Sequence, residues 1–203
     1  MGLISNGTTI FNNGAMASGF GGSLNFISKQ TASSSSTINF TTGIDSTYKE
    51  YIFYFVDLHP SNSDNYFEFN MSTDGGSNYN VTKTTTFFRV LRTQTGGTNV
   101  FAYLDTDDLA QGTGYQVLSE YGNADAEDSG CGYLHLFNPS STTFVKHYLS
   151  HVHYRRNYTS QSHASAQNFS GGYANTTSAV NAVSFRNRSG TIDSGDIILF
   201  GVS

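Results

Sequence analysis

The strongest constraint on the fold is an alternation of apolar and polar residues that recurs along most of the chain. Residues 36–42 (STINFTT), 65–72 (NYFEFNMS) and 115–121 (YQVLSEY) all follow this pattern. Successive side chains of a β-strand point to opposite faces of a sheet, so each segment predicts a half-buried strand. Residues 47–58 (TYKEYIFYFVDL) contain a nearly unbroken apolar run, which predicts a central strand.

Turn signals and the remaining apolar segments extend this pattern. Asp74-Gly75-Gly76 supplies the positive φ angles that a tight hairpin requires. Residues 106–114 can hold one helical turn with Thr106 as its N-cap, but no segment has a sustained helical period. We predict roughly ten strands. The others lie near residues 23–29, 81–92, 100–105, 131–137, 142–154, 179–186 and 196–202.

The composition also favours strands. The 16 Phe and 13 Tyr residues have high strand propensity, whereas charged residues, which normally cover helical surfaces, make up only 12%. Many short strands with turns at fairly even intervals predict an all-β fold. We expect an antiparallel two-sheet β-sandwich, jelly-roll-like, with a barrel as the alternative. We assign residues 26–203 to this domain.

Residues 1–25 differ from the rest of the chain, because Gly, Asn and Ala dominate and no period is sustained. They predict an N-terminal arm or docking segment that is held either by its own domain or by a neighbouring subunit. The segment lacks the basic and apolar regions of a signal peptide.

Charge and cysteine content argue against several classes of function. The net charge is −5 and the ten Lys and Arg residues are thinly spread, so we expect no nucleic-acid partner. No apolar run approaches the roughly 20 residues of a membrane-spanning helix, so we expect no membrane partner. The single cysteine, Cys131, excludes a disulfide framework within the chain.

The most unusual segment is KHYLSHVHYRR, residues 146–156, which holds three of the six histidines. It follows a turn at residues 138–141 and predicts the second strand of a hairpin. On a strand, one face carries His147, His151, His153 and Arg155. The other face has more apolar bulk and is assigned to the core: Phe144, Lys146, Tyr148, Ser150, Val152 and Tyr154.

This assignment leaves alternatives open. If the hairpin register slips by one residue, the histidines share a face with Leu134 and Leu136 instead. If they point outward, the histidine face is our predicted subunit contact, and histidine titration could make that contact pH-sensitive. His151 and His153 can also chelate a metal from one strand, but no carboxylate or thiol stands nearby in the sequence, so we expect no metal and no cofactor.

Other arrangements that could carry chemistry are incomplete. His59, Asp105 and Ser129 follow the order of a serine-protease triad but lack its flanking sequences and spacing. The acidic loop with Asn123, Asp125, Glu127 and Asp128 lacks the glycine and bidentate glutamate of a calcium loop. Glu50, Glu68 and Glu120 fall in different predicted strands, with nothing to pair them for glycoside hydrolysis. We expect no catalytic residues and no enzyme activity.

Four segments resemble small structural proteins of marine tailed bacteriophages. They are LISNGTTIF, FNMSTDGGSNY, LHLFNPSSTTFVKHYL and GTIDSGDIILFGV, and the last is similar to the final strand of many phage fibre and appendage domains. The resemblance covers most of the chain through short pieces. It implies a jelly-roll-like domain displayed on the particle, commonly as a trimer and without a cofactor. It does not distinguish a head from a tail location.

Taken together, the sequence predicts a non-enzymatic virion protein, either a head decoration or a tail or fibre appendage subunit. The expected partners are other virion proteins, such as the major capsid or tail proteins, and further copies in a homotrimer. We expect synthesis in the bacterial host cytoplasm and a final location in the virion. The alternative is a receptor- or carbohydrate-binding module at a fibre tip, because exposed Tyr and Asn side chains can bind a host surface glycan.

Overall fold

A computed structural model describes residues 3–5, 8–12, 15–16, 23–159 and 162–203 of the chain. The strands are β1 (Leu3–Ser5), β2 (Thr8–Asn12), β3 (Ala15–Met16), β4 (Leu24–Thr31), β5 (Ile38–Phe40), β6 (Glu50–Pro60), β7 (Asn65–Ser72), β8 (Lys83–Thr93), β9 (Asn99–Tyr103), β10 (Gln116–Gly122), β11 (Gly130–Phe137), β12 (Lys146–Thr159), β13 (Ser162–Ala174), β14 (Ala182–Asn187) and β15 (Ile192–Val202).

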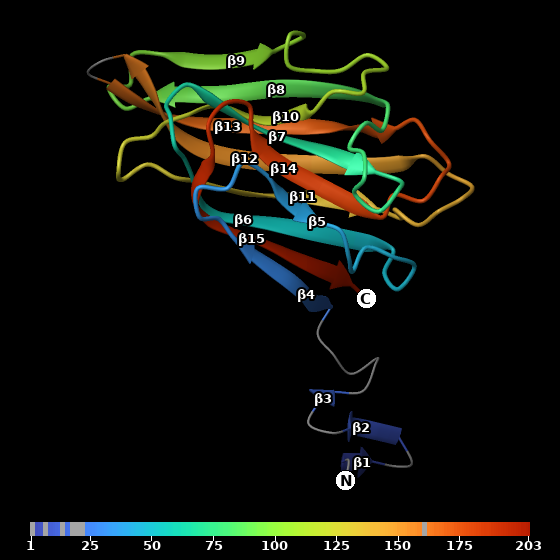
Figure 1. The fold of residues 1–203 in the computed structure, drawn as a ribbon. Coiled ribbons are helices and arrows are strands. Elements are labelled where there is room, and N and C mark those ends of the chain that lie inside the picture. Colours follow the sequence, from blue (N-terminus) through green and yellow to red (C-terminus); the bar gives the residue numbers. More distant parts are fainter. Residues whose placement is uncertain (1–2, 6–7, 13–14, 17–22, 160–161) are drawn as a thin grey trace.

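The fold class is confirmed: two antiparallel sheets pack face to face as a β-sandwich (Figure 1). The larger sheet has eight strands in the order β4-β15-β6-β11-β12-β13-β8-β9, and the smaller has four in the order β10-β7-β14-β5. The pairing of β15 with β4 begins at Leu24, so the first strand of the sandwich starts slightly before the predicted boundary. The described part of the chain contains no helix that could cross a membrane.

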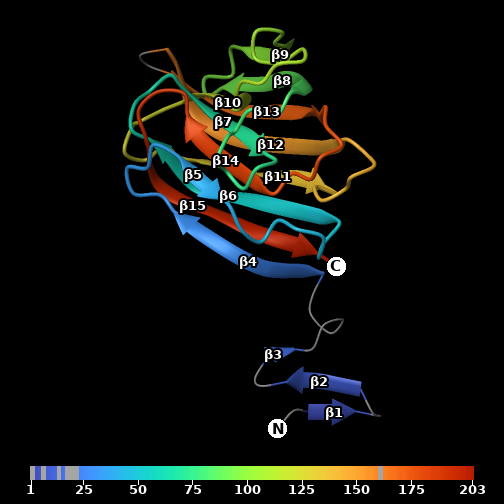
Figure 2. The ribbon, with the colours of Figure 1, turned by 45° about the vertical axis from the view of Figure 1, so that its right-hand side comes forward.

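A third, three-stranded sheet forms from β1, β2 and β3 within the predicted arm. Figures 1 and 2 show this small sheet standing apart from the sandwich. Its strands were not among those predicted, because glycine and asparagine interrupt the alternation on which that prediction depended.

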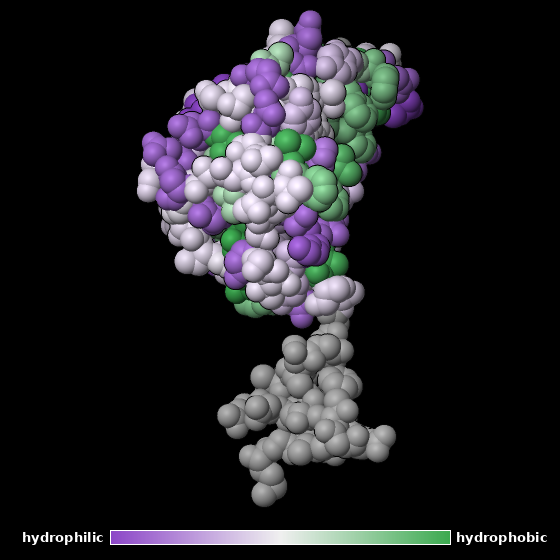
Figure 3. Space-filling view, turned by 90° about the vertical axis from the view of Figure 1, so that its right-hand side faces the viewer, coloured by the Kyte–Doolittle hydropathy of each residue, from purple (hydrophilic) through white to green (hydrophobic). Residues whose placement is uncertain are grey.

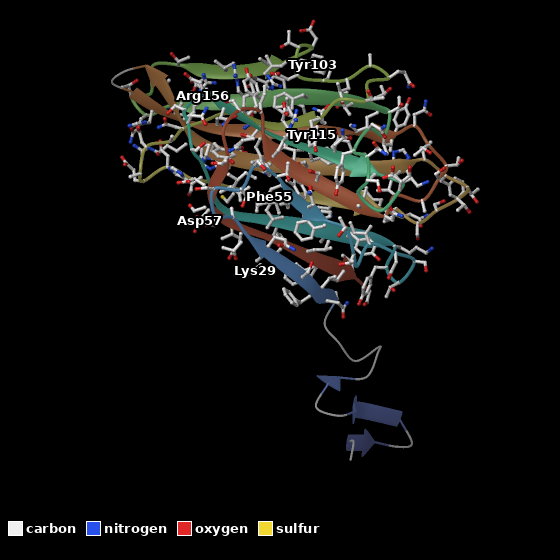
Figure 4. All side chains as sticks on the ribbon, in the orientation of Figure 1. Lys29, Phe55, Asp57, Tyr103, Tyr115 and Arg156 are labelled. Carbon is white, nitrogen blue, oxygen red and sulfur yellow. The ribbon has the colours of Figure 1, made fainter. Side chains whose placement is uncertain are left out.

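The core lies between the two sheets and is dominated by aromatic rings. Phe185 on β14 is fully buried and contacts the rings of five other phenylalanines. These are Phe40, Phe53, Phe55, Phe67 and Phe69, with centroid separations of 5.1 to 6.4 Å. Phe55, which is labelled in Figure 4, is 2% exposed. The predicted alternation therefore has its cause in burial: every second side chain of these strands enters one aromatic cluster.

Two local predictions were wrong. The strand β13, which spans Ser162–Ala174, was missed because its inward side chains are small and polar or aliphatic rather than large and apolar. Ala164 and Ala166 are buried there in a small cluster with Leu91 of the neighbouring strand β8, and the buried Asn168 donates to Ser119 of β10 in the other sheet. Residues 106–114 contain no helical turn and instead form a loop whose backbone pairs with the start of β8.

The hairpin of β11 and β12 settles the orientation of the histidines. Leu136 pairs with Tyr148 and Leu134 with Ser150, so both leucines share the core-facing side of the hairpin with Tyr148. The slipped register is therefore excluded, and His147, His151 and His153 point away from the core. Phe144 was wrongly assigned to the core: it precedes β12 in a loop and is 67% exposed.

Candidate functional site: the outer face of the eight-stranded sheet

The exposed hydrophobic side chains are distributed very unevenly over the two sheets. Among the described residues, nine large hydrophobic side chains are exposed. Eight of them lie on the side of the eight-stranded sheet that faces away from the core, which we call the outer face: Leu24, Phe26, Val56, Val90, Phe101, Tyr103, Tyr133 and Leu149. Only Phe144 lies elsewhere. Figure 3 views the sandwich from one end and shows hydrophobic residues gathered mainly along its right-hand side.

Strand register brings aromatic side chains of the outer face into one line across the sheet. Tyr54 pairs with Tyr133, Tyr133 with His151, His151 with Phe169, Phe169 with Phe88, and Phe88 with Tyr103. We call these six residues the aromatic row. It crosses β6, β11, β12, β13, β8 and β9, and the same register continues through Ile198 to Lys29 on β4. Figure 4 labels Lys29 and Tyr103 near opposite edges of the sheet.

The rings in the middle of the row stack on one another. His151 and Phe169 are 4.2 Å apart between ring centroids with planes only 8° apart, and Phe169 and Phe88 are 4.8 Å apart at 10°. Phe101 continues the series at 5.7 Å from Phe88. Cross-strand aromatic pairs of this kind stabilise a sheet. Because the rings contact each other face to face, they form a ridge that presents ring edges to the outside.

A hollow of about 460 Å³ lies on the outer face beside this ridge. Its walls include Tyr133, His135, Phe137, His151 and Phe169, with Leu149 and Gly171 also lining it. A Cβ atom at Gly171 would lie 3.1 Å from Leu149 Cδ2, so the glycine keeps the hollow open. The side chain of His135 is held by a hydrogen bond between its Nδ1 and the carboxylate of Glu50. The outer face thus combines an apolar ridge with an adjacent hollow.

The opposite surface of the sandwich has a different character. On the four-stranded sheet, Glu68 is only 3% exposed because it accepts bonds from Arg188 Nε at 2.7 Å and Arg186 Nε at 3.1 Å. The two guanidinium groups lie over the rings of Tyr66 and Tyr115, each 3.8 Å from the centroid. This surface is built from charged and polar groups that water solvates well. Its contrast with the outer face identifies the outer face as the candidate binding surface.

The predicted histidine face forms one part of the outer face. His151 Nε2 hydrogen-bonds Gln167 Oε1 at 3.1 Å, and His153 Nε2 hydrogen-bonds Ser165 Oγ at 2.9 Å. Burial lowers the pKa of His153, and the neighbouring His151 lowers it further, which favours the neutral imidazole. His153 is therefore favoured as a neutral member of the surface. Both His151 and His153 have a ring nitrogen already bonded to β13.

Arg155 is engaged by the acidic loop and does not extend freely from the histidine face. Its Nη1 lies 2.6 Å from Asp128 Oδ1 and 3.4 Å from Glu127 Oε1. Asp128 also forms the one group of three potential metal ligands found among the described residues, with Asp125 and His163. The guanidinium of Arg155 already neutralises the buried carboxylate of Asp128, so this cluster has a structural role as an ion pair holding the loop to β12.

The other predicted candidates for chemistry have separate partners. Glu50 binds His135, Glu68 binds the two arginines, and Glu120 binds Arg89 Nη1 at 2.5 Å. His59 contacts the backbone of Asp125, and Ser129 donates a hydrogen bond to Asp57. These contacts hold loops and strands together. They do not assemble a carboxylate pair or a triad from these residues.

The aromatic row and the hollow were not predicted from the sequence, because both depend on which strands lie next to each other. Phe169 lies in the strand that was not predicted, and without β13 the rings of β12 and β8 cannot be placed next to each other. The signal that could have found β13 is its position between two predicted strands, since residues 155–178 are too long for a simple connection.

Two charged groups are buried away from the outer face, near β8 and β10. Lys83 is fully buried, and its Nζ donates to Asn70 Oδ1 at 2.5 Å and to the Val81 carbonyl at 2.8 Å. Burial lowers the pKa of Lys83 to about 7. Burial also raises the pKa of Glu120 to about 7; the nearby Arg89 opposes this shift, whereas Asp107 adds to it.

We expect the free energy of unfolding to pass through a minimum near pH 7. Because the pKa of Glu120 is raised by folding, this residue contributes to the free energy of unfolding at low pH. The contribution is complete below 4.5, the pKa of the group in the unfolded chain, and is lost as the pH rises through about 7, its pKa in the folded chain. Because the pKa of Lys83 is lowered by folding, this residue contributes to the free energy of unfolding at high pH. The contribution is complete above 10.5, the pKa of the group in the unfolded chain, and is lost as the pH falls through about 7. Allowing for solvent screening, each effect should be about 1–2 kcal/mol.

Urea unfolding between pH 5 and 9 tests this expectation on the wild type and two variants. Glu120→Gln should flatten the curve on the acidic side only, and Lys83→Met should flatten it on the alkaline side only. If each variant keeps both slopes of the wild type, these two groups do not cause the pH dependence.

No protein-family model, curated protein or solved structure matches the chain. The geometry of the outer face is therefore the main guide to function.

Proposed function

We propose that the chain is a non-enzymatic structural subunit of a bacteriophage virion, displayed on the particle surface and assembled as a homotrimer. The observation that carries this proposal is the concentration on one face of eight of the nine large hydrophobic side chains that are exposed among the described residues. Apolar patches of this kind mark interaction surfaces, because a free monomer that exposes them is prone to aggregate. The resemblance to small virion proteins of marine tailed phages supplies the class of particle.

The proposed partners are other virion proteins of the head or tail, together with further copies of the chain. The three-stranded sheet of the arm supports this assignment, because it stands apart from the sandwich and offers strand edges for pairing with a neighbour (Figure 2). The protein would be made in the bacterial host cytoplasm and then incorporated into the virion.

Sedimentation of phage particles through a density gradient tests the proposal. The chain should appear in the particle band, in a fixed ratio to the other structural proteins, and should remain there after a salt wash. Quantitative mass spectrometry of the gradient fractions gives this ratio. A chain found only in the soluble fractions at the top of the gradient would rule out a virion subunit.

The hollow beside the aromatic ridge favours a second candidate, a receptor- or carbohydrate-binding module at a fibre tip. Its walls offer aromatic rings together with the polar edges of Tyr133, His135 and His151. The stacked rings of Phe88 and Phe169 already cover each other's faces, which leaves less ring surface for a sugar. A glycan array with the wild type and with Gly171→Val, which fills the hollow, tests this candidate: it predicts hits that the variant loses.

A further inference from the structure

We propose that the outer face is covered by the outer face of a second copy of this chain, so that the ridge of one copy packs beside the ridge of the next. This inference rests on the proposed function, since both require an assembled protein, but it names the occupant of the surface. The area, the charge and the shape of the face favour a second copy as its occupant.

The area of the face is sufficient for a stable contact between subunits. Eight strands have seven spacings of about 4.8 Å, which makes the face roughly 34 Å wide. Along β13 the outward side chains run from Ser165 to Tyr173, four steps of about 6.8 Å, or roughly 27 Å. The resulting footprint of roughly 900 Å² is close to the roughly 800 Å² that each partner contributes to a standard interface.

The charges on the face suit a partner that is also nearly neutral there. Lys29 and Asp196 are 3.0 Å apart and neutralise each other, and Glu50 is bound to His135. Arg155 is paired with the acidic loop of its own chain. Arg92 of β8 also points to the outer face, where it donates a hydrogen bond to Asn99 Oδ1 at 2.6 Å. Because the carboxylates named above are compensated within the chain, two copies can meet without burying any of them unpaired.

The shape of the face provides both halves of a self-complementary contact. The ridge of His151, Phe169 and Phe88 stands next to the hollow around Gly171. In a contact between like faces, each copy must offer both a projection and a recess. Leu149 is 58% exposed at this hollow and Phe101 is 76% exposed beyond the ridge, and both are available to a neighbour. A copy is also the partner present at equal concentration as soon as the chain folds.

Sedimentation velocity and mass photometry on the purified full chain test the contact. The mass should be three times 22.0 kDa if three outer faces meet around the axis of the proposed trimer, or twice 22.0 kDa if two faces meet as a closed pair. The assembly should persist or strengthen as salt screens the net charge of −5 on each copy. Leu149→Asp and Phe101→Asp should each weaken self-association at least tenfold. Phe144→Asp is the matched control, because Phe144 is similarly exposed but lies off the face, and it should leave the mass unchanged. Circular dichroism checks that all three variants fold.

Cys131 provides a second readout without a change on the face. It is the only cysteine, is exposed, and pairs with His153 on the outer face. Its reaction with a maleimide should slow as the protein concentration rises and copies cover the face. In the double variant Cys131→Ser/Asn39→Cys, the thiol lies on the exposed side of β5, in the other sheet, and its rate should not depend on concentration.

The outcomes separate this inference from the proposed function. A chain that stays at 22.0 kDa and whose Cys131 reacts at one rate overturns the inference, and if it is still found in particles then another virion protein covers the face. Self-association through the face without incorporation into particles supports the inference and overturns the virion proposal.

A dimer instead of a trimer supports the contact between copies and corrects the proposed stoichiometry. Glycan binding that Leu149→Asp abolishes in a monomer assigns the face to a sugar and overturns the inference.

Discussion

Phe185→Ala should lower the free energy of unfolding by about 3–5 kcal/mol, which is the usual range for removing a fully buried phenylalanine. The Phe185 ring contacts five other rings from both sheets, so its removal leaves a cavity that no single neighbour can fill. Urea denaturation followed by tyrosine fluorescence measures the change. We expect a lower transition midpoint with little change in slope.

Two controls define what this result means. Phe144→Ala removes a ring of the same size that is 67% exposed, and its effect should be within about 0.5 kcal/mol. Phe185→Leu keeps most of the volume and should be less damaging than alanine. If Phe185→Ala were no more destabilising than Phe144→Ala, the aromatic cluster would not be the core that joins the two sheets.

Lys146→Met should lower the free energy of unfolding by about 3 kcal/mol, as expected when hydrogen bonds from a buried charged donor are removed. The Lys146 ammonium donates to the carbonyl oxygens of Ser141, Phe144 and Thr176, at 2.6, 2.9 and 3.2 Å. Burial lowers the pKa of this ammonium, but its three acceptors keep it bound. Methionine has a similar shape and no donor, so it leaves these carbonyls without their partner.

Lys29→Met is the matched control for this prediction. Lys29 forms an exposed ion pair with Asp196, and removing such a pair typically changes stability by less than about 1 kcal/mol. Thermal unfolding of the two variants gives the comparison. Equal shifts in Tm would show that Lys146 contributes no more than an exposed cation, although it lies on the core-facing side of β12. Proteolysis in the loop at residues 138–145 should be faster in Lys146→Met alone.

Much of the fold could be predicted because it depends on local pattern. The alternation in residues 65–72 reflects Phe67, Phe69 and Met71 entering the core. The continuous apolar run in β6 arises because its inward residues enter the core while its outward residues, such as Tyr54 and Val56, belong to the apolar outer face. The strand β13 could not be found in this way. Its buried inward residues include alanine, serine and asparagine, which do not give the alternation of large apolar side chains that marks the other strands.

The candidate site was predictable only in part. That His147, His151 and His153 share one face follows from parity once β12 is known to be a strand. The choice between the two faces required the register of the β11–β12 hairpin, in which Leu136 pairs with Tyr148. A slip of one residue would exchange the faces. Arg155 was expected at a subunit contact, but its ion pairs with Glu127 and Asp128 lie outside any local pattern.

The sequence by itself determined that this chain is made of strands, that aromatic residues form its core, and that its surface is poor in charge. These properties depend on the period and composition of short segments, and each segment carries them independently of the others. Only the tertiary structure decided that Tyr54, Tyr133, His151, Phe169, Phe88 and Tyr103 form one row. That row depends on the pairing of strands distant in sequence, because hydrogen-bond register between neighbours, rather than any local preference, sets which side chains meet.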